Sequence, residues 1–511
     1  MNLDIAGSFG FVRYGELSDG YDMAQRSENE YEDFSEGFDD NLNEAMEYDE
    51  TNDAADRDEY NDEDQEYLES HMFETSFSGL NRMRGVSGVS TRLKSILRHL
   101  KCYQEPSVQL AALQKLAEIF SIATEDTLTK YFTCDPFIKE LVNLMKGAEL
   151  RNEEENSEIM LLACRCLSNL IEALPSALSN VVYNGAVSTL CSKLMEIQYI
   201  DLAEQALSAL ERISAEYPTS ILREGGLVAV LSYLDFFSTN VQRTAVTTVA
   251  NCSRNVPKEY FGAIKEVIPI LKRLLSYSDQ KIVEQACLAL VRLVESFKYN
   301  TKYLESIVTK DLTQNILDLI SSPTSSIVSP YIYTKLLTLI RHSAKGSSNL
   351  TSELLQDNII EVLYQVLTGS VFRNNEPNHL KSDSAALTKL LNRPSDQVCE
   401  ALGIAIELLP HLPKEEIITT HRKDSNGKKK VLKSNYNSRM RLLEKYPDTM
   451  TKFSEILLPT LIEVFSSNVV IAVRLRVITT LLKIIYYAKE EVLVRVLKDV
   501  PFAGFIAAIP F

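Results

Sequence analysis

The 511-residue sequence contains no tryptophan and only six histidines, and no histidine stands at metal-ligand spacing from a cysteine or a glutamate. Its eight cysteines are scattered and form no C-x-x-C pair. The sequence also lacks a G-x-x-x-x-G-K-[ST] phosphate loop, an H-E-x-x-H motif, a G-x-S-x-G elbow and a dinucleotide fingerprint. These absences predict a chain with no catalytic residues, no metal and no other cofactor.

Long apolar runs are missing as well. No stretch approaches the roughly 18–20 apolar residues that a membrane helix needs, and the first residues lack the basic region and apolar core of a secretory signal. Cys164, Cys191, Cys252 and Cys287 fall at apolar-face positions, which is typical of reduced core cysteines. We therefore expect a cytoplasmic or nuclear protein whose partners are neither membranes nor nucleic acids.

Negative charge is present in excess, but it is unevenly distributed. The formal net charge is −17, yet residues 1–75 hold 25 of the 70 acidic residues and three of the 53 basic ones, so that segment carries −22 and the remainder +5. Branched aliphatic residues are almost absent from this segment, so burial cannot offset its ordering entropy. Residues 1–88 are predicted to form a disordered acidic tail, which either solvates the chain or docks on a basic partner.

From Thr91 onward, apolar residues recur at helical spacing, and the helices repeat with a period near 40 residues. Each repeat contains three anchor residues, a small or apolar one followed by two others. The sets are Ala112, Leu116 and Ile119; Ala163, Leu167 and Leu170; Ala206, Leu210 and Ile213; Ala245, Val249 and Cys252; Ala286, Leu290 and Leu293; and Val477, Leu481 and Ile484. One unit cannot bury its own apolar stripe, but a stack of units can. The pattern predicts an all-α, armadillo/HEAT-like right-handed α-solenoid.

The register also predicts how the chain is divided. Regular armadillo-like repeats are expected over residues 89–300, irregular helical repeats with long loops over 301–450, and a further, apparently truncated repeat over 451–511. A basic loop at 421–434 is interpreted either as a solvated loop or as a nuclear import signal or anion-binding patch.

Glycine and proline mark helix starts within the repeats. Gly185 and Gly225 stand forty residues apart and should begin equivalent helices. Pro269 and Pro459 occupy matching places and are expected near a helix start, where a missing N–H costs little.

A stack of this kind presents a long surface to protein partners. The position just before the third anchor should lie on that surface, and it is occupied by Glu118, Asn169, Arg212, Asn251, Arg292 and Lys483. An asparagine amide both donates and accepts hydrogen bonds, which suits it to the backbone of a bound chain. We take Asn169, Arg212, Asn251, Arg292 and Lys483 as candidate partner-binding residues; the alternative is an exposed polar face without a function.

Two stretches of the sequence resemble a particular protein family. "REGGLVAVLSYLDFFSTNVQRTAVTTVANCSRNVP" and "FSEILLPTLIEVFSSNVVIAVRLRVITTLLKIIYYA" resemble the armadillo-like N-terminal half of the ubiquitin-fusion-degradation type HECT E3 ubiquitin ligases, a fungal group with an animal thyroid-receptor-interacting counterpart. The resemblance extends over most of residues 90–505. It implies a module that holds ubiquitin or ubiquitin-tagged substrates for proteasomal degradation.

The HECT domain, which in this family carries the catalytic cysteine and binds the E2, does not follow within the 511 residues. The chain alone is therefore expected to transfer no ubiquitin, although the family is one of ubiquitin transferases. Two other interpretations remain: an importin-like adaptor that holds basic peptides, and a scaffold that docks on the proteasome through the acidic tail. Basic residues at Arg212, Arg292 and Lys483 argue against a basic cargo, because like charges repel.

Overall fold

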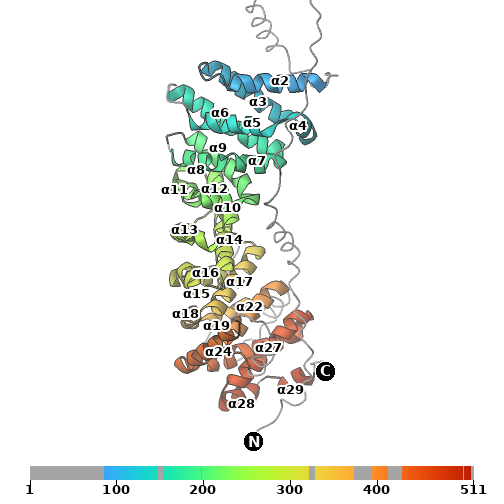
Figure 1. Ribbon diagram of the computed structural model, residues 1–511. Coiled ribbons are helices and arrows are strands. Elements are labelled where there is room, and N and C mark those ends of the chain that lie inside the picture. The colour runs from blue at the N-terminus through green and yellow to red at the C-terminus, as the bar shows by residue number, and fades with distance from the viewer. Residues whose placement is uncertain are drawn as a thin grey trace, which may run out of the picture. The chain divides into compact units, whose positions relative to one another are not determined.

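The computed structural model describes residues 86–147, 153–196, 198–321, 328–372, 393–412, 428–498 and 500–507. Residues 85–508 form one compact unit, in which every described element is a helix (Figure 1). The predicted acidic tail lies outside the described residues except for its last three, which begin α2 (Val86–Leu100). The predicted all-α solenoid is confirmed: the helices stack in chain order and contact mainly their neighbours along the sequence.

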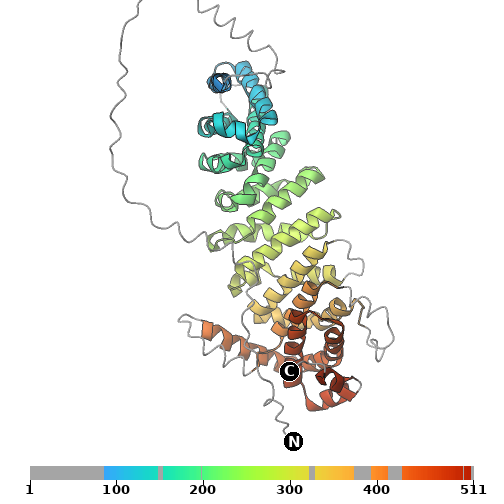
Figure 2. The same ribbon diagram turned by 90° about the vertical axis from the view of Figure 1, so that its right-hand side faces the viewer.

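From residue 125 onward, each repeating unit contains a short first element, a second helix and a long third helix. The third helices pack on one another in succession along the stack (Figure 2): α3 (Pro106–Ile122), α6 (Glu153–Ala173), α9 (Ile200–Glu216), α12 (Thr239–Cys252), α14 (Gln280–Phe297), α17 (Pro330–Gly346), α22 (Ser395–Leu408) and α27 (Ile471–Tyr487). We call the row that they form the third-helix wall.

The second helices each pack on the third helix of their own unit: α5 (Cys134–Lys146), α8 (Ala186–Met195), α11 (Gly226–Ser232), α13 (Phe261–Leu274), α16 (Lys310–Ser321), α19 (Ile359–Thr368) and α26 (Leu458–Ser467). The first elements are short: α4 (Glu125–Tyr131), α7 (Leu178–Tyr183), α10 (Pro218–Arg223), the 3-10 turn Lys258–Tyr260, α15 (Thr301–Ile307), α18 (Ser348–Gln356) and α25 (Asp448–Lys452). Helices α24 (Lys428–Lys445), α28 (Glu490–Lys498) and α29 (Phe502–Ala507) complete the described chain.

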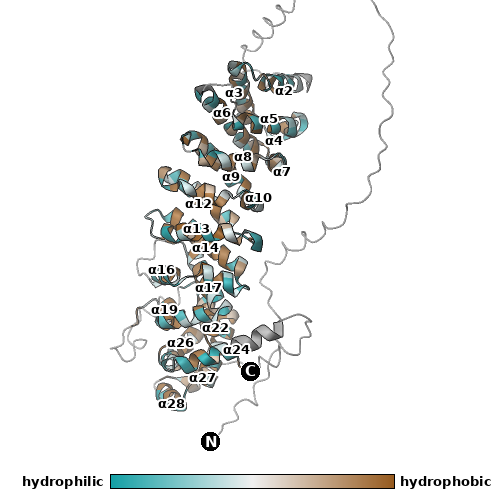
Figure 3. Cartoon of the chain, turned by 60° about the vertical axis from the view of Figure 1, so that its left-hand side comes forward, coloured by the Kyte–Doolittle hydropathy of each residue, from teal (hydrophilic) through white to brown (hydrophobic). Residues whose placement is uncertain are grey.

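The predicted anchors form the core of the stack. Ala206, Leu210 and Ile213 are fully buried, as are the equivalent residues of α6, α12 and α14, and those of α27 are at most 2% exposed. The exception lies in α3, where Ile119 is half-buried and the neighbouring Phe120 is buried instead. Figure 3 shows the result, with hydrophobic and hydrophilic residues on different sides of the helices.

Three of the second helices follow a residue in the left-handed backbone region. Gly185 (φ +77°) and Gly225 (φ +69°) precede α8 and α11 as predicted. A Cβ at either position would meet no atom within 4 Å. Glycine is therefore favoured there because it adopts this backbone conformation easily, and not because a side chain would lack space. Asn358 (φ +55°) occupies the same place before α19, since asparagine tolerates this region better than most residues do.

The two prolines differ in position. Pro459 lies in the first turn of α26, as expected, directly after a π-helical turn at Phe453–Leu457. Pro269 lies inside α13, so the expectation that it stands near a helix start is wrong. The α13 helix continues through Pro269 because its apolar face, including Ile264, Ile268 and Leu271, is buried in the stack.

The middle of the chain follows the same three-helix order. Helix α14 packs on α17, α17 on α22 and α22 on α27, so the wall continues across residues 301–450. Of the segment predicted as a basic loop, residues 421–427 lie outside the described residues, and Lys428 begins helix α24.

The four predicted core cysteines, Cys164, Cys191, Cys252 and Cys287, are buried and form no disulfide. Burial raises the pKa of the Cys164, Cys191 and Cys287 thiols to about 12, so they remain protonated and unreactive near neutral pH. Reduced thiols packed among apolar side chains are therefore part of the core.

The carboxyl group of Glu463 on α26 makes stability depend on pH. Burial raises its pKa to about 6, and one of its oxygens is buried without a hydrogen-bond partner. The protonated form favours folding, and this contribution is lost as pH rises through about 6. Glu463→Gln should therefore stabilise the chain by about 1 kcal/mol at pH 7.5, after discounting for solvent screening, but not at pH 4.5.

Thermal unfolding of the Glu463→Gln variant at both pH values measures this effect. Glu490→Gln, at an exposed position of α28, serves as the matched control and should change neither midpoint. An equal gain from Glu463→Gln at pH 4.5 and 7.5 would contradict the assignment to titration.

Candidate partner-binding surface

The third-helix wall carries one polar position per unit, just before the third anchor, and the structure completes this series. Besides the predicted residues, His342 on α17 and Glu407 on α22 stand at the equivalent places. Sequence reasoning missed both because the pattern is broken in these helices: the third position of α17 is the polar Ser343, and the second position of α22 is Ala405, where a larger residue was sought. The position before the third anchor does not by itself determine which of these side chains are exposed to solvent.

At the N-terminal end of the wall, the predicted residues are accessible. Glu118 is exposed and Asn169 is half-exposed. Arg212 lies at the surface, where its guanidinium forms an ion pair with Glu172 on α6, with 2.8 Å between Arg212 Nη2 and Glu172 Oε2. This part of the wall is open to a partner.

Asn251 and Arg292 lie farther along the wall and are bonded to the chain itself. The Asn251 amide donates to Ser214 Oγ at 3.0 Å and accepts from Arg292 Nη1 at 3.4 Å. Arg292 Nη1 also donates to the Ala250 carbonyl oxygen at 2.6 Å. These bonds tie α9, α12 and α14 together, so a bound chain would have to displace them before using the Asn251 amide.

Lys483 is buried, with 1% of its surface exposed, so the expectation that it lies on the partner-facing surface is wrong. Its ammonium donates to the Ile406 carbonyl oxygen at 3.1 Å, in the last turn of α22. Arg292 likewise donates to the Ala250 carbonyl oxygen. In both cases the acceptor residue directly precedes the polar residue of the preceding unit, which is Asn251 or Glu407. The long side chains of Arg292 and Lys483 therefore link neighbouring units, because each donates a hydrogen bond to a carbonyl oxygen near a helix end.

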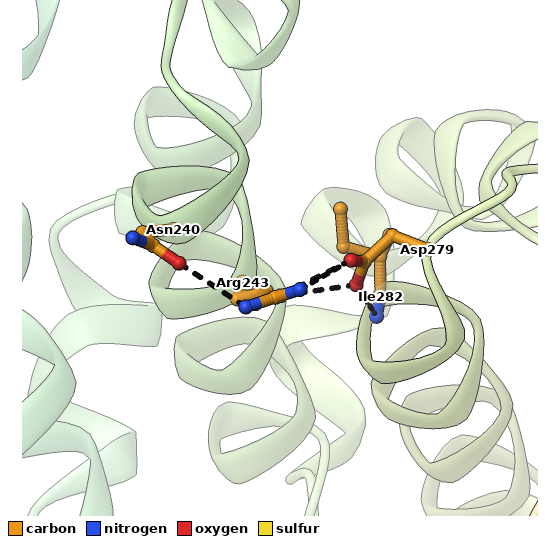
Figure 4. A network of polar contacts seen from close by, with 4 residues as sticks. All are labelled: Asn240, Arg243, Asp279 and Ile282. Carbon is orange, nitrogen blue, oxygen red and sulfur yellow. Dashed lines mark hydrogen bonds and ion pairs between the residues drawn. The ribbon is translucent and has the colours of Figure 1, made fainter.

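A second cross-link joins α12 to α14 (Figure 4). Arg243 pairs with Asp279, with 2.5 Å between Nη2 and Oδ2, and donates through Nη1 to Asn240 Oδ1 at 3.1 Å. Asp279 also caps α14 by accepting from the Ile282 backbone N–H at 3.0 Å. The hydrogen bond from Arg243 is the main reason why the pKa of Asp279 is lowered, so one carboxylate both caps a helix and binds two units together.

The side chains of Arg341 on α17 and Arg476 on α27 lie against α22 beside Gly403. Arg341 Nε lies 3.0 Å from Glu400 Oε2, and Arg476 Nη1 donates to the Cys399 carbonyl oxygen at 2.7 Å. A Cβ on Gly403 would stand 2.7 Å from Arg341 Cδ and 3.0 Å from Arg476 Nη1. The missing side chain therefore leaves room for guanidinium groups from both flanking units.

Comparison with known proteins identifies the relatives of this chain. A family model described as "E3 ubiquitin-protein ligase TRIP12-like, TPR repeats" matches residues 16–223. E3 ubiquitin-protein ligase UPL3 of Arabidopsis thaliana is 36% identical over 442 residues, which cover 83% of this chain and 22% of that protein. The chain is similar to TRIP12-like E3 ubiquitin-protein ligases over part of their length.

Zebrafish E3 ubiquitin-protein ligase TRIP12 supports this relationship, with 28% identity over 477 residues, 83% of this chain and 23% of that protein. The chain thus spans less than a quarter of the length of these two relatives. Although the family model names TPR repeats, the units described above contain three helices, the armadillo arrangement, whereas a TPR unit contains two.

A more distant likeness is to armadillo-type proteins of another class. Importin subunit alpha-1b of Oryza sativa is 23% identical over 287 residues, 55% of this chain and 49% of that protein. Among solved structures, an engineered protein matches 81% of this chain and 93% of its own length at 19% identity and a TM-score of 0.49.

In the part of the chain that the structure describes, no group of three or more His, Cys, Asp or Glu residues is placed to hold a metal ion. No single described helix is long and apolar enough to cross a membrane; only the sharply bent pair Asn156–Ala173 and Pro175–Tyr183 passes by length and composition.

Proposed function

We propose that the third-helix wall holds ubiquitin-tagged proteins as the substrate-binding module of a HECT-type E3 ubiquitin ligase that acts in proteasomal degradation in the cytoplasm or nucleus. The observation that carries this proposal is the 36% identity to UPL3 along 83% of the chain. The E2 would bind the HECT domain of such a ligase and not this array. A stack of helices with an open polar face suits the holding of a folded protein.

The accessible part of the wall indicates where the tagged protein binds. Asn169 and Arg212 lie on neighbouring third helices, and Arg212 is held at the surface by Glu172. Asn251 and Arg292 are bonded to each other, and Lys483 is buried. We therefore assign the first contact with ubiquitin to α6 and α9.

Di-ubiquitin binding tests this assignment. Combined replacement Asn169→Ala and Arg212→Glu should weaken the Kd of the full chain for di-ubiquitin by about tenfold, because it removes an amide and reverses a charge at the contact. Biolayer interferometry with di-ubiquitins of several linkages measures the change.

Lys130→Glu, on the short helix α4, is the control for a charge reversal at an exposed site and should leave the Kd unchanged. A wild-type chain that binds none of the di-ubiquitins would refute the proposed function. Equal Kd values for the wild type and the double variant would refute only the location.

The second candidate function is an importin-like adaptor, which the similarity to importin subunit alpha-1b favours. Such an adaptor would hold basic peptides, yet cations stand beside both asparagines of the wall, at Arg212 and Arg292. Saturable binding of a lysine-rich peptide in preference to di-ubiquitin would select this alternative. The proteasome-docking scaffold depends on the acidic tail, which lies outside the described residues, and stays a prediction.

A further inference from the structure

Cations gather where α14 and α17 end. The Lys298 carbonyl oxygen, just after α14, lies 2.9 Å from the place that a Cβ on Gly346 would take, so the ends of the two helices touch. Around His342, the neighbouring cations are Arg341, Lys298, Lys345 and Lys335. Burial first, and then these four cations, lower the pKa of His342 to about 3 and keep its imidazole neutral. Basic side chains therefore converge here from two units.

The cluster extends to a third unit. Arg254, which follows α12 and is exposed, lies close enough to Arg292 to help lower the pKa of the Arg292 guanidinium, after burial as the main cause. Tyr331 at the start of α17 also lies near Arg292. Cations on or just after α12, α14 and α17 thus lie near one another around two side chains, Arg292 and His342.

Two exposed tyrosines accompany these cations. The Tyr299 side chain is 89% exposed and Tyr331 is 60% exposed. Lys298 Nζ lies 5.3 Å from the centre of the Tyr299 ring, and Lys335 Nζ lies 5.8 Å from that of Tyr331. Large aromatic side chains beside cations are costly to leave in water and are typical of contact surfaces.

The positive charge is only partly balanced. Lys335 pairs with Glu295 at 3.7 Å, and Lys345 pairs with Glu407 at 3.4 Å. Among the described residues, no carboxylate lies within ion-pair distance of Arg254 or Lys298. Arg254 and Lys298 can therefore bind an external anion, while Glu295 and Glu407 place negative charge among the other cations.

We propose that this basic-aromatic patch, formed by Arg254, Lys298, Tyr299, Tyr331, Lys335 and Lys345, binds an acidic peptide segment that contains aromatic residues. Carboxylates of the peptide pair with Arg254 and Lys298, and its rings pack on Tyr299 and Tyr331. A nucleic acid fits less well, because Glu295 and Glu407 would meet its evenly spaced phosphates. The proposal concerns other residues than the di-ubiquitin contact on α6 and α9 and stands without it.

Fluorescence anisotropy with the full chain tests the proposal. The probe is a labelled synthetic peptide of glutamate, aspartate and tyrosine; the comparison ligands are a labelled lysine-rich peptide and a single-stranded oligonucleotide. We expect saturable binding of the acidic peptide that weakens with salt. Arg254→Glu combined with Lys298→Glu should raise its Kd on the order of tenfold, and Tyr331→Ala should raise it severalfold.

Lys94→Glu combined with Lys130→Glu, at exposed sites of α2 and α4, matches the charge change elsewhere and should leave the Kd unaltered. Because all substituted side chains are partly or fully exposed, circular dichroism melts should be unchanged. An equal loss in both double variants, no binding of the acidic peptide, or tighter binding of the oligonucleotide would overturn the proposal. Di-ubiquitin binding measured on the Arg254→Glu, Lys298→Glu variant should stay at the wild-type value, because both residues lie outside the third helices, and this separates the patch from the ubiquitin contact.

Discussion

Replacing Arg439 by alanine is expected to release α24 from the stack at a cost of about 3–5 kcal/mol, the largest loss that we predict for this chain. Arg439 is 4% exposed although its side chain is charged. Its guanidinium donates to the Ala344 carbonyl oxygen near the end of α17, to the Glu407 carbonyl oxygen at 3.1 Å, and to Ser348 Oγ at 3.3 Å. Alanine would remove a donor from all three acceptors, and of these only the Ala344 carbonyl oxygen would keep another among the described residues, the Thr351 hydroxyl at 2.9 Å.

Burial also lowers the pKa of Arg439 to about 10, so the side chain remains charged at neutral pH and depends on these acceptors. Two of them are carbonyls in the last turns of third helices, which have no partner within their own helix. The α24 helix begins at Lys428, in the segment that the sequence marks as basic. Arg439 therefore holds the basic segment to the wall.

Hydrogen exchange measured by mass spectrometry checks this prediction, because release of α24 should remove protection from Lys428–Lys445 first. Arg441→Ala removes a guanidinium from an exposed site of the same helix and should leave protection unchanged. Full protection of α24 in the Arg439→Ala variant would show that other contacts hold the helix.

Replacing Ala206 by phenylalanine is expected to lower the free energy of unfolding by about 1–3 kcal/mol through overpacking. Ala206 is fully buried on α9, and α9 packs on α6, α8 and α12. The alanine allows these helices to approach closely, and a phenylalanine ring has no space there without moving one of them. Since each unit contacts mainly its neighbours, the damage should stay near α9.

Thermal unfolding of Ala206→Phe measures the loss, and Ala215→Phe is its control. Ala215 lies on the same helix but is exposed, so the same substitution should leave the midpoint within about a degree. An unaltered midpoint for Ala206→Phe would mean that this face of α9 is not packed as described.

The polar series shows where sequence reasoning reached its limit. Arg212 and Lys483 occupy the same register position, yet Arg212 lies at the surface beside Glu172 and Lys483 is buried between units. A repeat fixes the angle at which a side chain leaves its helix but not how closely the next helix approaches. Asn251 was predicted from its amide chemistry, but its partners, Ser214 and Arg292, come from two other units.

The sequence by itself determined that the chain is helical, that its units repeat near every forty residues, and which apolar residues face inward, because these depend on spacing within one helix. It also carried the likeness to the ubiquitin ligases. Only the tertiary structure decided which cations are buried as cross-links and which remain at the surface. The burial of Lys483 and Arg439 and the convergence of Arg254, Lys298 and Lys335 depend on contacts between helices far apart in the sequence, and no local pattern encodes those distances.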